Sequence, residues 1–205
     1  MREDPADDEL VRQHLAGDPD AFGALVARHR DRVYRLCLRV VGDADDALDA
    51  SQDAFLNALR NLDRFRGDAA FTTWLHRVTV NACYDLLRKR QRQPMLHLVT
   101  DEQDGPVREP GPPVADHADE VAGTHDAAAA LSSVPEEFRV ALVLADVHDL
   151  AYAEIASILE IPVGTVKSRV HRGRIALAKV MGISRPADPP PGEPDGRAPA
   201  SKEER

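Results

Sequence analysis

Basic side chains gather near the C-terminal end of the sequence, in a pattern that suits binding to a polyanion. No Asp or Glu lies between Glu160 and Asp188, although this interval holds six Lys or Arg residues. Val166, Val170 and Leu177 recur here at helical spacing, which predicts a helix with one apolar and one polar face. The polar residues form a candidate DNA-binding surface, made of Thr165, Lys167, Ser168, Arg169, His171 and Arg172.

The segment 151–170 has the composition of a helix-turn-helix. Two short stretches of helical periodicity are separated by a few residues that include Pro and Gly, an arrangement that places a second helix in a DNA major groove. Arg172 or Lys167 could bind guanine edges in that groove. Arg169 and Arg174 could hold the flanking phosphates. The alternative interpretation is a basic helix face that is only solvated.

A second basic cluster lies near the middle of the chain and includes aromatic residues. Between Phe71 and Arg92 the only acid is Asp85. Cations interleaved with aromatic rings suit unstacked, single-stranded bases. The cluster comprises Arg64, Phe65, Arg66, Phe71, Trp74, Arg77, Asn81, Arg88, Lys89, Arg90 and Arg92. For Phe71 and Trp74 a place in the hydrophobic core is the alternative, and it does not conflict with a binding role for their neighbours.

A third candidate surface is acidic. Asp46, Asp49 and Asp53 lie near one side of a predicted helix, together with Gln52. A stripe of carboxylates would repel nucleic acid, so it is better suited to a basic protein surface. A solvated acidic face is the alternative interpretation.

The overall composition favours an all-α protein. The 205 residues are 43% hydrophobic and 4% aromatic, which suits helices packed through Ala, Leu and Val. The net charge of −9 coexists with two basic clusters, which indicates a polyanion and a second, basic partner. No run reaches the roughly 20 apolar residues of a membrane span and no signal peptide is visible, so we expect a cytoplasmic protein without membrane insertion. Cys37 and Cys83 have no zinc or CxxC spacing and are expected to be structural thiols.

Changes in composition divide the chain into five parts. An acidic N-terminal segment, 1–19, precedes a first helical domain at 20–93. The segment 94–126 is rich in Pro, Gly and acids and holds the single base Arg108, so it cannot bury enough apolar surface to fold. A second helical domain, 127–182, contains the helix-turn-helix, and the tail 183–205 is expected to be disordered. The predicted fold is therefore all-α, with two small helical domains joined by a flexible acidic linker.

Three stretches of the sequence resemble one protein family. They are residues 46–55 (DALDASQDAF), residues 65–78 (FRGDAAFTTWLHRV) with Asn81, and residues 164–170 (GTVKSRV). In this order they resemble the extracytoplasmic-function (ECF) sigma factors of bacterial RNA polymerase, which belong to the sigma-70 family. The stretch 74–83 is most like the actinobacterial sigma-M type.

The resemblance implies one polymerase-binding and two DNA-binding surfaces. Region 2, 20–93, would bind the coiled coil of the β′ subunit of core polymerase through Asp46, Asp49, Gln52 and Asp53. It would also melt and bind the −10 promoter element through Phe65, Arg66, Gly67, Asp68, Phe71, Asn81, Arg88 and Arg90. Region 4, 127–182, would meet the β flap and read the −35 element through Thr165, Lys167, Ser168, Arg169, His171 and Arg172.

The resemblance also implies an anti-sigma factor as partner, and neither catalytic activity nor a metal or cofactor. Some positions depart from the family pattern. Leu48 and Ala50 make the acidic helix less polar than in many relatives, and Asp53 stands where Glu is common. Because other bases or aromatics occur at the position of His171, no −35 sequence preference is carried over.

Two other functions remain open from the sequence. The first is a stand-alone helix-turn-helix transcriptional regulator whose first domain senses a ligand or partner. The second is a metal-dependent hydrolase that would use His117, His125, His148 and Asp149. The sequence has no HExxH, GxSxG or P-loop motif, which disfavours the hydrolase.

Overall fold

The computed structural model describes residues 5–92 and 130–182, and within these ranges it contains helices and no strand. The elements are α1 (Asp7–Leu15), α2 (Pro19–Val41), α3 (Ala44–Arg60), the 3-10 helix η1 (Leu62–Arg64), α4 (Phe71–Arg92), α6 (Glu136–Asp146), α7 (Tyr152–Leu159) and α8 (Val163–Val180). The all-α prediction is therefore confirmed. The predicted linker at 94–126 and the predicted disordered tail at 183–205 lie outside the described residues.

The ends of α2 and α3 are defined by capping residues. Asp18 accepts a hydrogen bond of 2.9 Å from an amide in the first turn of α2, and Pro19 stands at the first helical position. Gly42 ends the helix with φ of 81°, a left-handed conformation that glycine adopts without steric cost. Asp43 then caps α3 through a bond of 3.0 Å to another first-turn amide. Local sequence therefore sets where both helices begin and where α2 ends.

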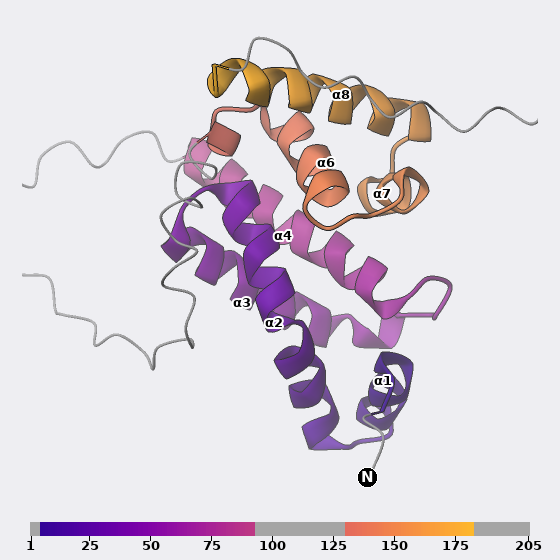
Figure 1. Cartoon of the computed structure of the whole chain (residues 1–205). Helices are drawn as coiled ribbons and strands as arrows, with labels where there is room; N and C mark the ends of the chain where they lie inside the picture. The colour runs from indigo at the N-terminus through magenta and orange to yellow at the C-terminus, as the bar shows by residue number, and fades with distance from the viewer. Residues whose placement is uncertain (1–4, 93–129, 183–205) are drawn as a thin grey trace, which may run out of the picture.

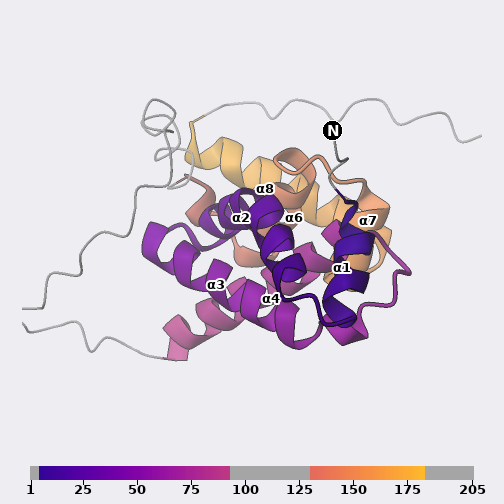
Figure 2. The ribbon, with the colours of Figure 1, turned by 90° about the horizontal axis from the view of Figure 1, so that it is seen from below.

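Helix α3 packs against α2 and α4 through alanines. Ala47, Ala50, Ala54 and Ala58 are all fully buried, and Figure 2 shows α3 lying along the other two helices. Small side chains allow helix axes to approach closely, while larger residues such as Leu36 fill the remaining space. This packing uses one face of α3 and leaves its opposite face, with the acidic residues, toward solvent.

Helix α1 is an element that the sequence analysis missed. The sequence of 1–19 predicts an acidic segment without a helix, yet Asp7–Leu15 is helical and packs against α2. Leu10 and Val11 are each 3% exposed and anchor it to the core of the first domain. The acids Asp7 and Asp8 lie in its first turn, where carboxylates interact favourably with the helix dipole.

The second domain is built around α6. Residues 140–144 of this helix are all buried, and α8 crosses it at Gly173. A Cβ at this glycine would lie 3.0 Å from the carbonyl oxygen of Phe138 and 3.2 Å from the Cβ of Leu142, so the missing side chain permits the close crossing. Between α7 and α8 the chain turns at Glu160, whose φ is 54°. These elements form the predicted helix-turn-helix.

The two helical domains lie against each other. Helix α6 packs on α2 and α7 packs on α4, as Figure 1 shows, and their buried residues form one continuous core. At the contact the Arg77 guanidinium lies 3.2 Å from the Glu160 carboxylate. The rings of His76 and His148 meet edge to face at 5.3 Å. None of the helices in 5–92 and 130–182 combines the length and the hydropathy that a membrane span needs.

Candidate polymerase and nucleic-acid interfaces

The candidate −35 surface lies on the solvent side of α8. Val166, Val170 and Gly173 are buried against the rest of the second domain, which confirms the predicted apolar face. The opposite side presents four exposed side chains, Lys167, Ser168, His171 and Arg172. Thr165 and Arg169 are partly buried at the edges of this face.

Several polar groups on α8 already have partners within the protein. The Ser168 hydroxyl donates a hydrogen bond of 2.9 Å to the Thr165 carbonyl. Arg169 lies 2.9 Å from the Glu137 carboxylate. The Arg172 guanidinium sits over the Phe138 ring at 5.8 Å, so its position is guided by a cation–π contact. These contacts hold the side chains of this face in defined positions.

Arg174 does not lie on the exposed face, in contrast to the phosphate-binding role considered for it. Its guanidinium forms two hydrogen bonds to the Asp146 carboxylate, Nε to Oδ2 at 3.0 Å and Nη2 to Oδ1 at 2.7 Å. Hydrogen bonding to this carboxylate raises the pKa of Arg174. A bidentate pair of this kind is among the stronger ion pairs in proteins, so Arg174 stabilises the α6–α8 contact.

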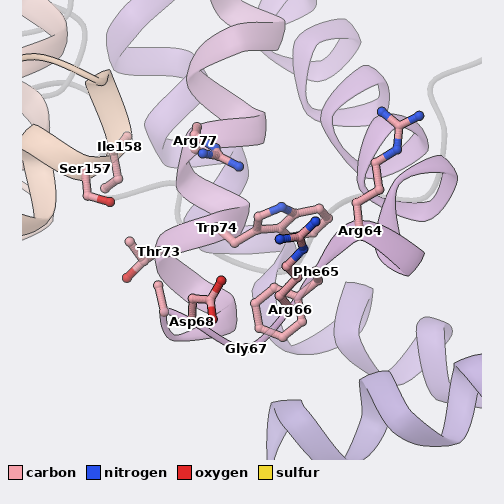
Figure 3. Close-up of a pocket in the computed structure, with 11 residues that line it drawn as sticks. Arg64, Phe65, Arg66, Gly67, Asp68, Thr73, Trp74, Arg77, Ser157 and Ile158 are labelled. Carbon is pink, nitrogen blue, oxygen red and sulfur yellow. The ribbon is translucent and has the colours of Figure 1, made fainter.

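An arginine-rich cavity lies where the loop before α4 faces α7 (Figure 3). Its volume is about 380 Å³. The loop and α4 supply most of its lining, while Ser157 and Ile158 come from the second domain. Four of the −10 candidates, Phe65, Arg66, Gly67 and Asp68, line it together with Arg64, Ala69, Thr73, Trp74 and Arg77. The structure therefore brings the loop candidates together in one pocket.

Three aromatic rings form a cluster beside this cavity. Phe65 and Trp74 line it, with ring centroids 5.6 Å apart. Phe71 packs against both rings at 5.7 Å but is only 3% exposed. Phe71 is thus a core residue, as the alternative interpretation held, and it supports the other two rings from behind instead of facing a ligand.

The remaining −10 candidates lie away from the cavity, along α4. Asn81 is exposed two helical turns beyond Trp74, and Arg88 is exposed near the end of the helix. Arg88 forms an exposed ion pair of 3.1 Å with Asp85. Loop and helix candidates therefore do not form one compact site, although a strand of nucleic acid could follow α4 from one to the other.

The acidic surface on α3 differs from its prediction in two respects. Asp49, Gln52 and Asp53 are exposed as expected. Asp46 instead lies 2.6 Å from the Arg90 guanidinium at the end of α4, and its side chain is only 25% exposed. The same face also presents three leucines that are 41–51% exposed, which are Leu48, Leu56 and Leu59. The sequence analysis singled out Leu48 as a departure from the family pattern but not Leu56 or Leu59.

Two histidines meet at the contact between the domains, and the sequence analysis did not predict this contact: His76 is 3% exposed and His148 is partly buried. Burial, together with the neighbouring His148 and Arg32, lowers the pKa of His76 to about 4. Burial also lowers the pKa of His148 to about 4, with contributions from Arg32, Arg35 and Arg39 on α2. Both histidines are therefore neutral at pH 7. A charged ring in this contact would be disfavoured by burial and by the nearby arginines.

The residues that suggested a metal site do not assemble into one in the described ranges. His148 faces His76, and Asp149 occupies a turn with φ of 51°. His117 and His125 lie outside the described residues. Across 5–92 and 130–182, no group of three or more His, Cys, Asp or Glu residues could hold a metal ion.

The two cysteines lie together in the core of the first domain. Cys37 on α2 and Cys83 on α4 are fully buried and within hydrogen-bonding distance of each other. The hydrogen bond to Cys37 and the burial both raise the pKa of Cys83. A buried thiol with a raised pKa is a poor nucleophile, which fits a packing role.

Comparisons with known proteins agree with this arrangement. Family models described as Sigma-70 region 2 and Sigma-70, region 4 match residues 25–93 and 125–177. The chain is 39% identical to the ECF RNA polymerase sigma factor SigM of Mycobacterium tuberculosis, over 88% of this chain and 87% of SigM. It is 41% identical to the ECF sigma factor SigE of Mycolicibacterium smegmatis over 77% of this chain, and the match spans 60% of SigE.

A solved structure is similar as well. The structure of CnrH in complex with the cytosolic domain of CnrY matches with a TM-score of 0.64 at 25% identity, over 88% of this chain and 100% of CnrH. Because both domains match in the same order, a stand-alone helix-turn-helix regulator is not favoured. The extent and identity of the match to SigM establish that the chain belongs to the ECF sigma factors of RNA polymerase.

Proposed function

We propose that this sigma factor binds core RNA polymerase through α3 and selects promoters through two separate DNA-binding surfaces. It acts through binding energy and catalyses no covalent step, in the cytoplasm where polymerase and DNA meet. The single observation that supports this most strongly is the exposed face of α8. In a chain with a net charge of −9, this face carries two Lys or Arg side chains and no acid.

The exposed face of α8 would enter the major groove at the −35 element. Arg172 and Lys167 are long enough to reach guanine edges, and His171 lies between them on the same side of the helix. Because Arg172 is steadied by the Phe138 ring, little side-chain entropy is lost when it binds. Arg169 and Ser168, whose side chains are held by Glu137 and Thr165, would orient this face and contact the phosphate backbone of the DNA.

The cavity before α4 would hold an unstacked base of the −10 element. Phe65 and Trp74 provide aromatic surfaces, and Arg64, Arg66 and Arg77 surround them with positive charge. Stacking of a base on an aromatic side chain contributes about 1–3 kcal/mol. From the cavity the strand would continue along α4 toward Asn81 and Arg88. Helix α7 lies over one side of the cavity, so a DNA strand of several nucleotides requires the domains to separate.

The exposed face of α3, which carries both carboxylates and leucines, would bind core polymerase. Exposed leucines bury apolar area on association, and Asp49 and Asp53 beside them select a partner with basic side chains. We assign this face to the coiled coil of the β′ subunit. The second domain would meet the β flap, since Val180 at the end of α8 and Met181 directly after it are exposed apolar residues.

An anti-sigma factor is the partner we propose for the resting protein. The similar protein CnrH was solved with the cytosolic domain of CnrY. In the present chain the exposed leucines of α3 offer an apolar surface that a protein could cover in the same step in which it excludes polymerase.

A transcription assay tests the central proposal. The full chain is mixed with bacterial core polymerase and a library of promoter fragments, and run-off transcripts are compared with those from core alone. Transcripts that depend on the protein and share −35 and −10 sequences are expected. Folded protein that neither associates with core on gel filtration nor directs any transcript would contradict the proposal.

A further inference from the structure

Helix α1 lies outside the residues matched by the region 2 family model, which begin at residue 25. It nevertheless contacts both α2 and η1, and η1 leads directly into Phe65 and the cavity loop. Its buried residues Leu10 and Val11 fix it firmly in this place. The helix is therefore positioned to influence the pocket without lining it.

Asp7, in the first turn of α1, ties this helix to α2 through two side chains. The Arg28 guanidinium donates to Asp7 Oδ1 at 2.6 Å, and its second Nη donates to the Pro5 carbonyl at 2.8 Å. His29 Nε2 lies 2.9 Å from Asp7 Oδ2. Since a carboxylate only accepts, Nε2 carries the proton in this bond and the imidazole is held in one tautomer and one orientation.

The oriented histidine is itself part of the aromatic cluster. The His29 ring is 6% exposed and lies 5.5 Å from the Phe71 ring. Phe71 in turn contacts Phe65 and Trp74, the two rings that line the cavity. A continuous series of contacts therefore runs from Asp7 through His29 and Phe71 to the base-binding rings.

We propose that Asp7 and His29 are positioning residues for the −10 base pocket. Asp7 fixes the orientation of the His29 ring. That ring fixes the position of Phe71, and Phe71 in turn holds Phe65 and Trp74 at the wall of the cavity. Because buried side chains are close-packed, a change in the tilt of the His29 ring displaces its aromatic neighbours. The inference rests on the proposed role of the pocket in −10 binding.

The test compares two alanine variants that remove the same charge from the same helical turn. Asp7→Ala loses the bonds to Arg28 and His29, whereas Asp8→Ala alters an exposed neighbour. Trp74 is the only tryptophan of the chain and reports on the pocket by its fluorescence. The Asp7 variant is expected to shift the emission of Trp74, and the Asp8 variant to match the wild type.

Binding is measured with holoenzyme assembled from core polymerase and each full-length variant. The probe is a single-stranded −10 oligonucleotide taken from a promoter identified by the run-off assay. Asp7→Ala is expected to weaken oligonucleotide binding about 5-fold, less than loss of a direct charged hydrogen bond can cause, with core affinity unchanged. His29→Gln retains a donor near the position of Nε2 but removes the ring, so it should give a similar loss.

The outcomes separate the inference from the function on which it rests. If Phe65→Ala abolishes oligonucleotide binding while Asp7→Ala and His29→Gln bind like wild type, the positioning role is wrong and the pocket stands. If Phe65→Ala also binds normally, the pocket itself is misassigned and the inference falls with it. Equal losses of oligonucleotide and core affinity in Asp7→Ala would indicate general unfolding and would also overturn the inference.

Discussion

The faces of α3 and α8 are built differently from the −10 pocket. Each of these two faces is one side of a single helix, so its members lie within a short stretch of sequence. The pocket draws on the loop before α4, on α4 itself and on α7, and the aromatic rings behind it reach α2. Substitutions on the α3 or α8 face should therefore change one binding function alone. Substitutions in the −10 pocket, which several elements build together, should also disturb the packing of their neighbours.

The largest expected effect is on the α3 face. Reversing both Asp49 and Asp53 to Lys should lower core affinity about 100-fold, because two attractive pairings become repulsive. Titration of labelled core polymerase at two salt concentrations measures this loss, which should shrink at high salt. Since the two side chains are exposed and distant from α8, promoter discrimination by holoenzyme formed at high protein concentration should stay at the wild-type level. Wild-type core affinity in the double variant would remove the α3 assignment.

The next expected effect is on α8. Arg172→Ala should reduce discrimination between the cognate −35 element and a version with one changed base pair by about 1–3 kcal/mol, the usual contribution of a bidentate base contact. Competition binding with holoenzyme and paired promoter fragments gives this difference directly. Lys179→Ala, an exposed cation on α8 outside this face, is the matched control and should keep the wild-type discrimination. Undiminished discrimination with Arg172→Ala would place base recognition elsewhere.

The sequence predicted which residues share one side of α3 or α8 and which loop residues cluster before α4, but it did not predict the contacts that other helices make with them. A helical period of 3.6 residues already places Lys167, His171 and Arg172 on one side, and Asp49 and Asp53 on another. The Asp46–Arg90 ion pair joins residues 44 positions apart, so only the packing of α3 on α4 reveals it. Helix α1 was missed because its acidic first turn masks the two residues, Leu10 and Val11, that bury it.

The contact between the domains gives a prediction for stability against pH. His76 and His148 have a pKa of about 4 in the folded protein, below the value of 6.5 for a free histidine. Unfolded chains thus bind more protons between these values, and stability that is present above pH 6.5 is lost as the pH falls toward 4. Each histidine should lower the free energy of unfolding by about 1–2 kcal/mol between pH 7 and pH 5.

Chemical denaturation of the wild type and of His148→Phe measures this dependence. The variant keeps a ring at this position that cannot be protonated. Its free energy of unfolding should therefore fall less between pH 7 and pH 5, by the amount that one histidine contributes. A steep loss of equal size in both proteins would show that the buried pair does not control the dependence.

The smallest effect should come from the ion pair between the same two domains. Arg77 and Glu160 are 3.2 Å apart, but their side chains are 43% and 74% exposed, so water and salt screen their attraction. Glu160→Gln should change the unfolding free energy by less than about 0.5 kcal/mol, in contrast to the buried histidine contact a short distance away. Denaturation at low and high salt measures the difference. A loss well above 1 kcal/mol would mean that the domains are held together mainly by this pair, and that their contact depends on charge more than on the buried core they share.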